Sequence, residues 1–105
     1  MDLVIIKQDP RVDSHVLANN IQNQHKNVLS LIDSYKSDFD ELGTVAFKTR
    51  TFITNGGKQK QRIALLNEDQ AYLLLSFSKN TEHVRKLKVE LVKSFSRFRQ
   101  NIQVD

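Results

Sequence analysis

A helix near the N-terminus is predicted by apolar residues that recur every three or four positions. Val28, Ile32, Tyr35 and Phe39 fall at i, i+4, i+7 and i+11, the spacing of one buried face on a helix from residue 24 to about residue 42. The other side of its first turns carries side chains that can form hydrogen bonds outward. They are Gln24, His25, Lys26, Asn27 and Ser30.

A shorter helix is expected just before this one. Asp13 or Ser14 can cap it, and Val16 and Leu17 begin its apolar side. Five Asn and Gln residues between positions 19 and 24 favour caps and turns over helix interiors, so we expect a tight turn with Asn23 opening the second helix. This outline is that of a helix-turn-helix, although many small helix pairs share it without touching DNA.

Residues rich in β-branched and aromatic side chains predict strands on both sides of the helix pair. Residues 3–6 (LVII) are expected to form a strand that ends before a turn at Asp9 and Pro10. Residues 45–54 and 61–66 are predicted to pair as a hairpin, because the intervening Asn55-Gly56-Gly57 favours the positive φ of a tight reversal.

Two more helices are expected in the last third of the chain. Asn67 can cap a short buried helix over residues 71–77, and Thr81 can cap a long one. The apolar positions of the long helix recur at steps of three and four; they include Val84, Leu87, Leu91, Phe95 and Phe98. The predicted fold is α+β: a single winged helix-turn-helix-like domain over residues 1–105, with a β-hairpin wing and a long C-terminal amphipathic helix.

The charge distribution adds a candidate partner. The net charge is +4, but residues 1–44 carry seven acids against four bases, whereas residues 45–66 carry five bases and no acid. The five are Lys48, Arg50, Lys58, Lys60 and Arg62. An acid-free basic hairpin indicates a polyanionic partner, although lysines also protect an ordinary edge hairpin from aggregation.

These features together predict binding to double-stranded DNA. The helix from residue 24 would enter the major groove through the five polar residues of its front, where Gln24 and Asn27 could pair with adenine. The five cations of the hairpin would hold backbone phosphates. His25 has two interpretations: it contacts a phosphate or base edge, or it caps the helix or packs between the two helices through its ring.

Little in the sequence indicates catalysis. The histidines at 15, 25 and 83 are isolated from one another and from any HxxH or HExxH pattern, so neither an enzyme nor a metal or cofactor site is expected. The chain has no cysteine, which excludes disulfides and fits a reducing compartment. Without a signal peptide or an apolar stretch near the ~18 residues of a membrane span, a cytoplasmic location is expected.

With these residues, the chain resembles the phage regulatory protein Rha family from about residue 3 to residue 98. The matching features are the strand LVII at 3–6, the cap Ser14, HKNVL at 25–29, Phe47, Phe52, IALLNEDQA at 63–71, LLLSFS at 73–78, and Val84, Lys88, Leu91, Val92 and Phe95. The order and spacing of these features carry the likeness. The chain departs from the pattern at Gln70, where the family often has Gly, and at Leu91, where it often has Tyr; both positions are expected to be structural.

The resemblance implies a temperate-phage or prophage regulator acting in the bacterial cytoplasm. From its residues, we interpret the protein as a DNA-binding transcriptional regulator. The alternative is a protein-binding antirepressor-type module that occupies a phage or host regulatory protein, which the acidic first 44 residues favour. Val89 and Val92 widen the apolar face of the last helix, which would suit a homodimer.

Overall fold

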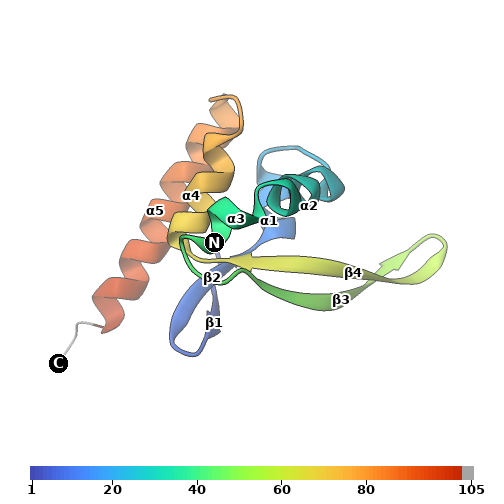
Figure 1. The fold of residues 1–105 in the computed structure, drawn as a ribbon, viewed down its shortest axis with the longest axis horizontal. Coiled ribbons are helices and arrows are strands. Elements are labelled where there is room, and N and C mark those ends of the chain that lie inside the picture. The colour runs from blue at the N-terminus through green and yellow to red at the C-terminus, as the bar shows by residue number, and fades with distance from the viewer. Residues whose placement is uncertain (103–105) are drawn as a thin grey trace.

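The fold is α+β, with helices packed around one end of a curled antiparallel sheet (Figure 1). The computed structural model describes residues 1–102, without the side chain of Ile102. Its elements are β1 (Val4–Ile6), β2 (Asp9–Asp13), α1 (Ser14–Asn20), α2 (His25–Ser34), α3 (Lys36–Asp40), β3 (Ala46–Thr54), β4 (Gly57–Leu66), α4 (Glu68–Ser76) and α5 (Glu82–Ile102). The strand order is β1-β2-β4-β3. The β3–β4 hairpin projects away from the helices, and α4 and α5 lie at the opposite end.

The N-terminal strand belongs to a hairpin that the sequence did not predict. Lys7 and Gln8 form its turn with φ of 49° and 69°, and the chain returns as β2. The turn expected at Asp9 and Pro10 is therefore wrong, because Pro10 pairs with Ile5 inside the ladder. A two-residue turn with positive φ at both positions matches the twist of the flanking strands. Pro10 is tolerated because β2 pairs with β4 only beyond it.

The helix predicted from residue 24 to about residue 42 is divided in two. Tyr35 leaves the helical conformation, at φ −115° and ψ 30°, and separates α2 from α3. The predicted buried face survives in Val28, Ile32 and Phe39, but the Tyr35 ring stacks on Phe77 at the surface, with 4.9 Å between ring centroids. Tertiary packing thus overrides the local periodicity at one position.

The long hairpin is confirmed, and its return strand is longer than predicted. β4 begins at Gly57 instead of residue 61, and the register runs without interruption from Thr54 opposite Gly57 to Ala46 opposite Leu65. Gly57, with φ +104°, supplies the positive φ of the reversal. Near the helices, the last four residues of β4 are buried and complete the core.

The two C-terminal helices form as predicted. Asn67 caps α4, and the Thr81 hydroxyl accepts a hydrogen bond from the Val84 N–H in the first turn of α5. Both helices bury apolar side chains in a core to which the other helices and the strands β2 and β4 also contribute. The core includes Val12, Leu17, Val28, Ile32, Phe39, Leu66, Leu74, Leu75, Val84, Leu87, Leu91 and Phe95.

Gln70 is fully buried and joins three parts of the chain. Its Nε2 donates to the carbonyl oxygens of Phe39 at 3.2 Å and Gly43 at 2.7 Å, while its Oε1 accepts from Arg11 and from the Asn67 N–H. Leu91 is also fully buried. The two departures from the family pattern are therefore structural positions, as expected.

Replacing Gln70 by alanine is expected to lower the free energy of unfolding by about 2–4 kcal/mol, because several buried polar groups lose their partners at about 1–3 kcal/mol each. Urea unfolding followed by circular dichroism measures the change. Gln100→Ala, at an exposed position of α5, is the matched control and should change stability by less than about 0.5 kcal/mol. Equal effects of the two substitutions would contradict the network.

Candidate nucleic-acid interface

The turn between α1 and α2 is held by short polar contacts. Gln22 takes a positive φ of 58°, and the Asn23 side chain accepts hydrogen bonds from the Gln24 N–H at 2.8 Å and the Asn27 amide at 3.0 Å. The helix starts at His25, with Gln24 in the cap position predicted for Asn23. The first turn of α2 is thereby fixed against the turn that precedes it.

His25 lies at the junction of α1, α2 and β4. Its Nε2 is 2.8 Å from the Ser14 hydroxyl, and the same hydroxyl oxygen accepts a hydrogen bond from the Ala64 N–H. The His15 ring lies 5.1 Å from the His25 ring and stacks on Phe52 of the hairpin. Burial, and then the neighbouring His15, lower the pKa of His25.

These contacts correspond to the packing interpretation of His25. Because the Ser14 oxygen already accepts from Ala64, its O–H can donate to Nε2, which requires an unprotonated ring nitrogen. The segment HKNVL therefore carries a residue that links two helices to the sheet. A contact of His25 with DNA stays a prediction.

The remaining predicted residues of α2 lie on its outer side. Gln24, Lys26, Asn27 and Ser30 are all exposed. Asn27 uses one amide hydrogen to reach Asn23 and keeps a second one to donate. Four side chains that form hydrogen bonds thus cover one surface of a short, well-anchored helix.

The register of the hairpin divides its five cations between two faces. Side chains alternate across a strand, and directly paired residues point to the same face. Lys48 and Arg50 therefore share one face with Phe52, whereas Lys58, Lys60 and Arg62 share the other with Ile53. The sequence placed all five on one hairpin, but it did not show that they form two groups.

Both arginines of the hairpin are engaged within the protein. Arg50 Nη1 lies 2.6 Å from a carboxylate oxygen of the buried Asp13. Arg62 Nη2 lies 2.6 Å from a carboxylate oxygen of Asp33, and its guanidinium lies 4.7 Å from the centre of the Phe47 ring. These pairs attach the base of the hairpin to β2 and α2.

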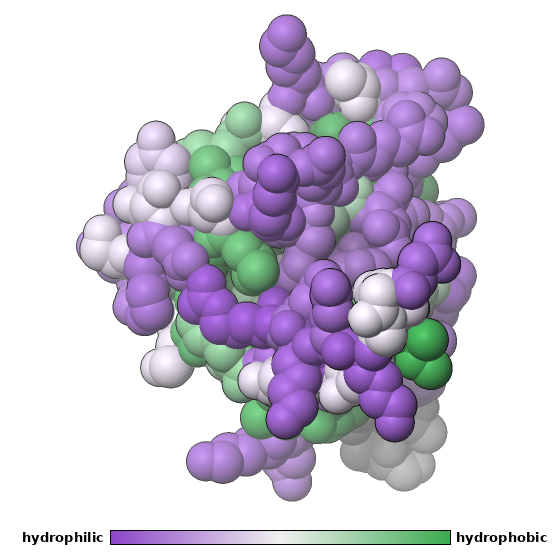
Figure 2. All heavy atoms as spheres, turned by 90° about the vertical axis from the view of Figure 1, so that its right-hand side faces the viewer, coloured by the Kyte–Doolittle hydropathy of each residue, from purple (hydrophilic) through white to green (hydrophobic). Residues whose placement is uncertain are grey.

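The three lysines of the hairpin have no acidic partner among residues 1–102; they are Lys48, Lys58 and Lys60. Lys58 and Lys60 stand on the outer part of the hairpin, where residues 53–60 are all exposed. Figure 2 views the molecule from the side toward which the hairpin projects and shows hydrophilic residues over most of that surface. The hairpin end is therefore a basic surface with free ammonium groups.

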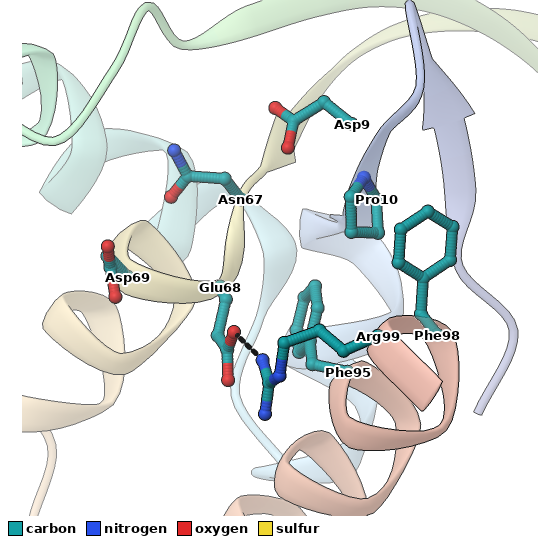
Figure 3. Close-up of a pocket in the computed structure, with 8 residues that line it drawn as sticks. All are labelled: Asp9, Pro10, Asn67, Glu68, Asp69, Phe95, Phe98 and Arg99. Carbon is teal, nitrogen blue, oxygen red and sulfur yellow. Dashed lines mark hydrogen bonds and ion pairs between the residues drawn. The ribbon is translucent and has the colours of Figure 1, made fainter. Parts of the chain in front are cut away.

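A hollow lies far from the hairpin end, between β2, α4 and α5 (Figure 3). It has a volume of about 270 Å³ and is lined by Asp9, Pro10, Asn67, Glu68, Asp69, Phe95, Phe98 and Arg99. Arg11 binds Asp9, while Arg99 and the Tyr72 hydroxyl bind Glu68. Burial, together with that hydrogen bond, raises the pKa of Tyr72 to about 12. The Arg99–Glu68 pair joins α5 to α4, whereas the other two contacts lie within β2 and within α4.

Residues 1–102 contain no cluster of three or more His, Cys, Asp or Glu side chains placed to hold a metal ion. Among the same residues, every helix is too short or too polar to span a lipid bilayer.

Comparison with known proteins gives one family match. The family model described as phage regulatory protein Rha matches residues 12–100, which include every predicted DNA-binding residue. The match leaves out β1 and the turn at Lys7 and Gln8. No curated protein and no solved structure matches the chain.

Because His25 is packed between the helices, the stability of the fold is expected to fall in mild acid. Its folded-state pKa lies below 6.5, so the unfolded chain binds the proton first as the pH falls below 6.5. The contribution of His25 to the free energy of unfolding is fully present above pH 6.5. It is lost as the pH falls toward the lower pKa of the folded state. Unfolding in urea at closely spaced pH values from neutral into mild acid measures this slope.

The matched variants are His25→Gln and His83→Gln, the latter at an exposed position of α5. His25→Gln is expected to flatten the pH dependence, whatever its effect on stability at neutral pH. His83→Gln should keep the wild-type slope. A wild-type slope in His25→Gln would contradict the assignment.

Proposed function

Because the chain belongs to the phage regulatory protein Rha family, we propose that it regulates phage or prophage genes by binding double-stranded DNA. The family is a regulatory one, and such a protein would work in the cytoplasm of the bacterial host. The observation that carries the DNA-binding proposal is the placement of an acid-free hairpin beside a helix with an exposed polar front; three lysines of the hairpin have no acidic partner within residues 1–102.

The relation between α2 and the hairpin supports a winged helix-turn-helix mode of binding. The Arg62–Asp33 pair connects the last turn of α2 to β4, and the His15 ring connects α1 to Phe52 of β3. A winged helix needs this coupling, because helix and wing must meet the groove and the flanking backbone together. In this mode Lys26, Asn27 and Ser30 would face the major groove.

The ion pairs also weaken the main argument for the alternative function. Four of the seven acids in residues 1–44 are paired; they are Asp9, Asp13, Asp33 and Asp40. Asp33 is the only acid within α2, and Arg62 neutralises it. The acidic total of the first 44 residues therefore places little free negative charge on the helix that would approach DNA.

A protein-binding, antirepressor-type module is the second candidate. The observation that favours it is the stacked pair Tyr35 and Phe77, large apolar rings that are both exposed, with Leu42 also exposed. Val89 and Val92 are likewise exposed on α5, which supports the proposed homodimer. Such side chains suit protein contacts more than phosphate contacts.

Neutralising the two outer lysines tests the proposed wing. The double variant Lys58→Gln, Lys60→Gln is expected to bind all duplex sequences more weakly and to reduce the slope of log K against log salt concentration by about 2, because each lost phosphate contact removes about 0.9. Fluorescence anisotropy on random duplex DNA over a range of salt concentrations measures both quantities. An unchanged slope would remove the wing from the proposal.

The control for net charge is Lys86→Gln, Lys93→Gln, which removes the same charge from α5, where both lysines pair with glutamates. It should leave the salt slope near that of the wild type. If both double variants change the slope equally, the effect comes from overall charge and not from the hairpin.

Replacing Asn27 tests base reading separately from phosphate binding. Asn27→Ala is expected to change the sequences recovered by selection from a random duplex library, because an asparagine can pair bidentately with adenine at about 1–3 kcal/mol of discrimination. Ser34→Ala, at an exposed position near the end of the same helix, is the control. An equal loss of affinity on every sequence would show that Asn27 reads no base.

A further inference from the structure

The end of the β3–β4 hairpin carries a large apolar side chain in open solvent. Ile53 is 84% exposed, against 54% for Val89, the next most exposed large apolar residue in the described part of the chain. An exposed isoleucine is ordinary by itself. Ile53 differs because it lies beside the free end of a basic hairpin, where it could contact a bound polyanion.

Ile53 is surrounded by groups that suit a polyanion. It is directly opposite Lys58, and the adjacent pair on the same face is Thr51 with Lys60. Residues 45–66 contain no acid, so nothing in the hairpin would repel a phosphate backbone. A side chain that avoids water thus has two lysines of β4 beside it on the same face of the hairpin.

The hairpin base is attached firmly enough to position this side chain. Arg50 and Arg62 bind Asp13 and Asp33, and Phe52 stacks on His15. At about 3.3 Å per residue, residues 51–54 carry the end roughly 13 Å past Arg50. That reach exceeds the ~7.5 Å depth of the minor groove.

We propose that the hairpin end enters the minor groove and that Ile53 inserts between two stacked base pairs as an apolar wedge. Lys58 and Lys60, which lie beside Ile53 on β4, hold the adjacent phosphates. This inference rests on the DNA binding proposed above and specifies how the wing engages the duplex. Insertion unstacks one base step and kinks the DNA by about 20–90°. Flexible pyrimidine–purine steps, which kink at low cost, are then the favoured sites.

Förster resonance energy transfer across a duplex of about 30 base pairs, labelled at both ends, measures the kink. Wild-type protein is expected to raise the transfer. Ile53→Ser loses this rise but keeps the wild-type salt slope, because the lysines remain. Ile53→Met, another apolar wedge, restores the rise. Ile5→Ser, which removes an exposed isoleucine from β1, is the matched control and behaves as wild type.

A second readout does not depend on any variant. A duplex with 2-aminopurine at a pyrimidine–purine step should gain fluorescence when wild-type protein is bound, because the base loses a stacking neighbour. The wedge is overturned if wild-type protein binds DNA with neither signal, or if Ile53→Ser keeps both; DNA binding itself then stands. If wild-type protein binds no duplex at low salt, both proposals fall together.

Discussion

The buried carboxylate of Asp13 is the constraint on which the arrangement of the molecule depends. One of its oxygens accepts the His15 N–H at 2.6 Å and so starts α1, while the other lies 2.6 Å from Arg50 of the hairpin. A single side chain at the end of β2 therefore sets the start of the helix pair and the base of the hairpin. Removing Arg50 would leave the buried Asp13 carboxylate without its compensating charge, which is strongly destabilising.

The other ion pair of the hairpin has a different character. Arg62 and Asp33 are each about half exposed, so their attraction contributes at most about 1 kcal/mol to stability. Its consequence is geometric and electrostatic, since it aligns α2 with β4 and removes the only acidic charge of α2. The positive surface that remains is made by lysines, whose flexible stems suit contacts with phosphates at varied positions.

The sequence predicted the elements well where they depend on interactions between residues close together in the chain. The cap at Asn67, the apolar steps of α5 and the glycine turn of the hairpin each depend on neighbours within a few residues. The turn at Lys7 and Gln8 was missed because neither residue type is typical of positive φ. The break at Tyr35 was missed because the stacking of its ring on Phe77 is a tertiary contact between residues far apart in the sequence.

The candidate site was predictable in composition more than in geometry. The ten residues named from the sequence lie on α2, at its start and on the hairpin, but the sequence could not show which of them the fold itself uses. Arg50, Arg62 and His25 find their partners through tertiary contacts, with Asp13, Asp33 and Ser14. Side chains alternate between the two faces of the hairpin, so the cations fall into two groups. These groups could be assigned only once the register of the two strands was known.

We propose that α2 and the hairpin form one DNA-binding surface. The change in backbone amide NMR shifts when a random duplex is added to the intact protein at low salt tests this directly. Shifts are expected to concentrate at residues 24–30 and 51–60, with α5 nearly unchanged. Shifts confined to α5, or the absence of any shift at excess DNA, would contradict it.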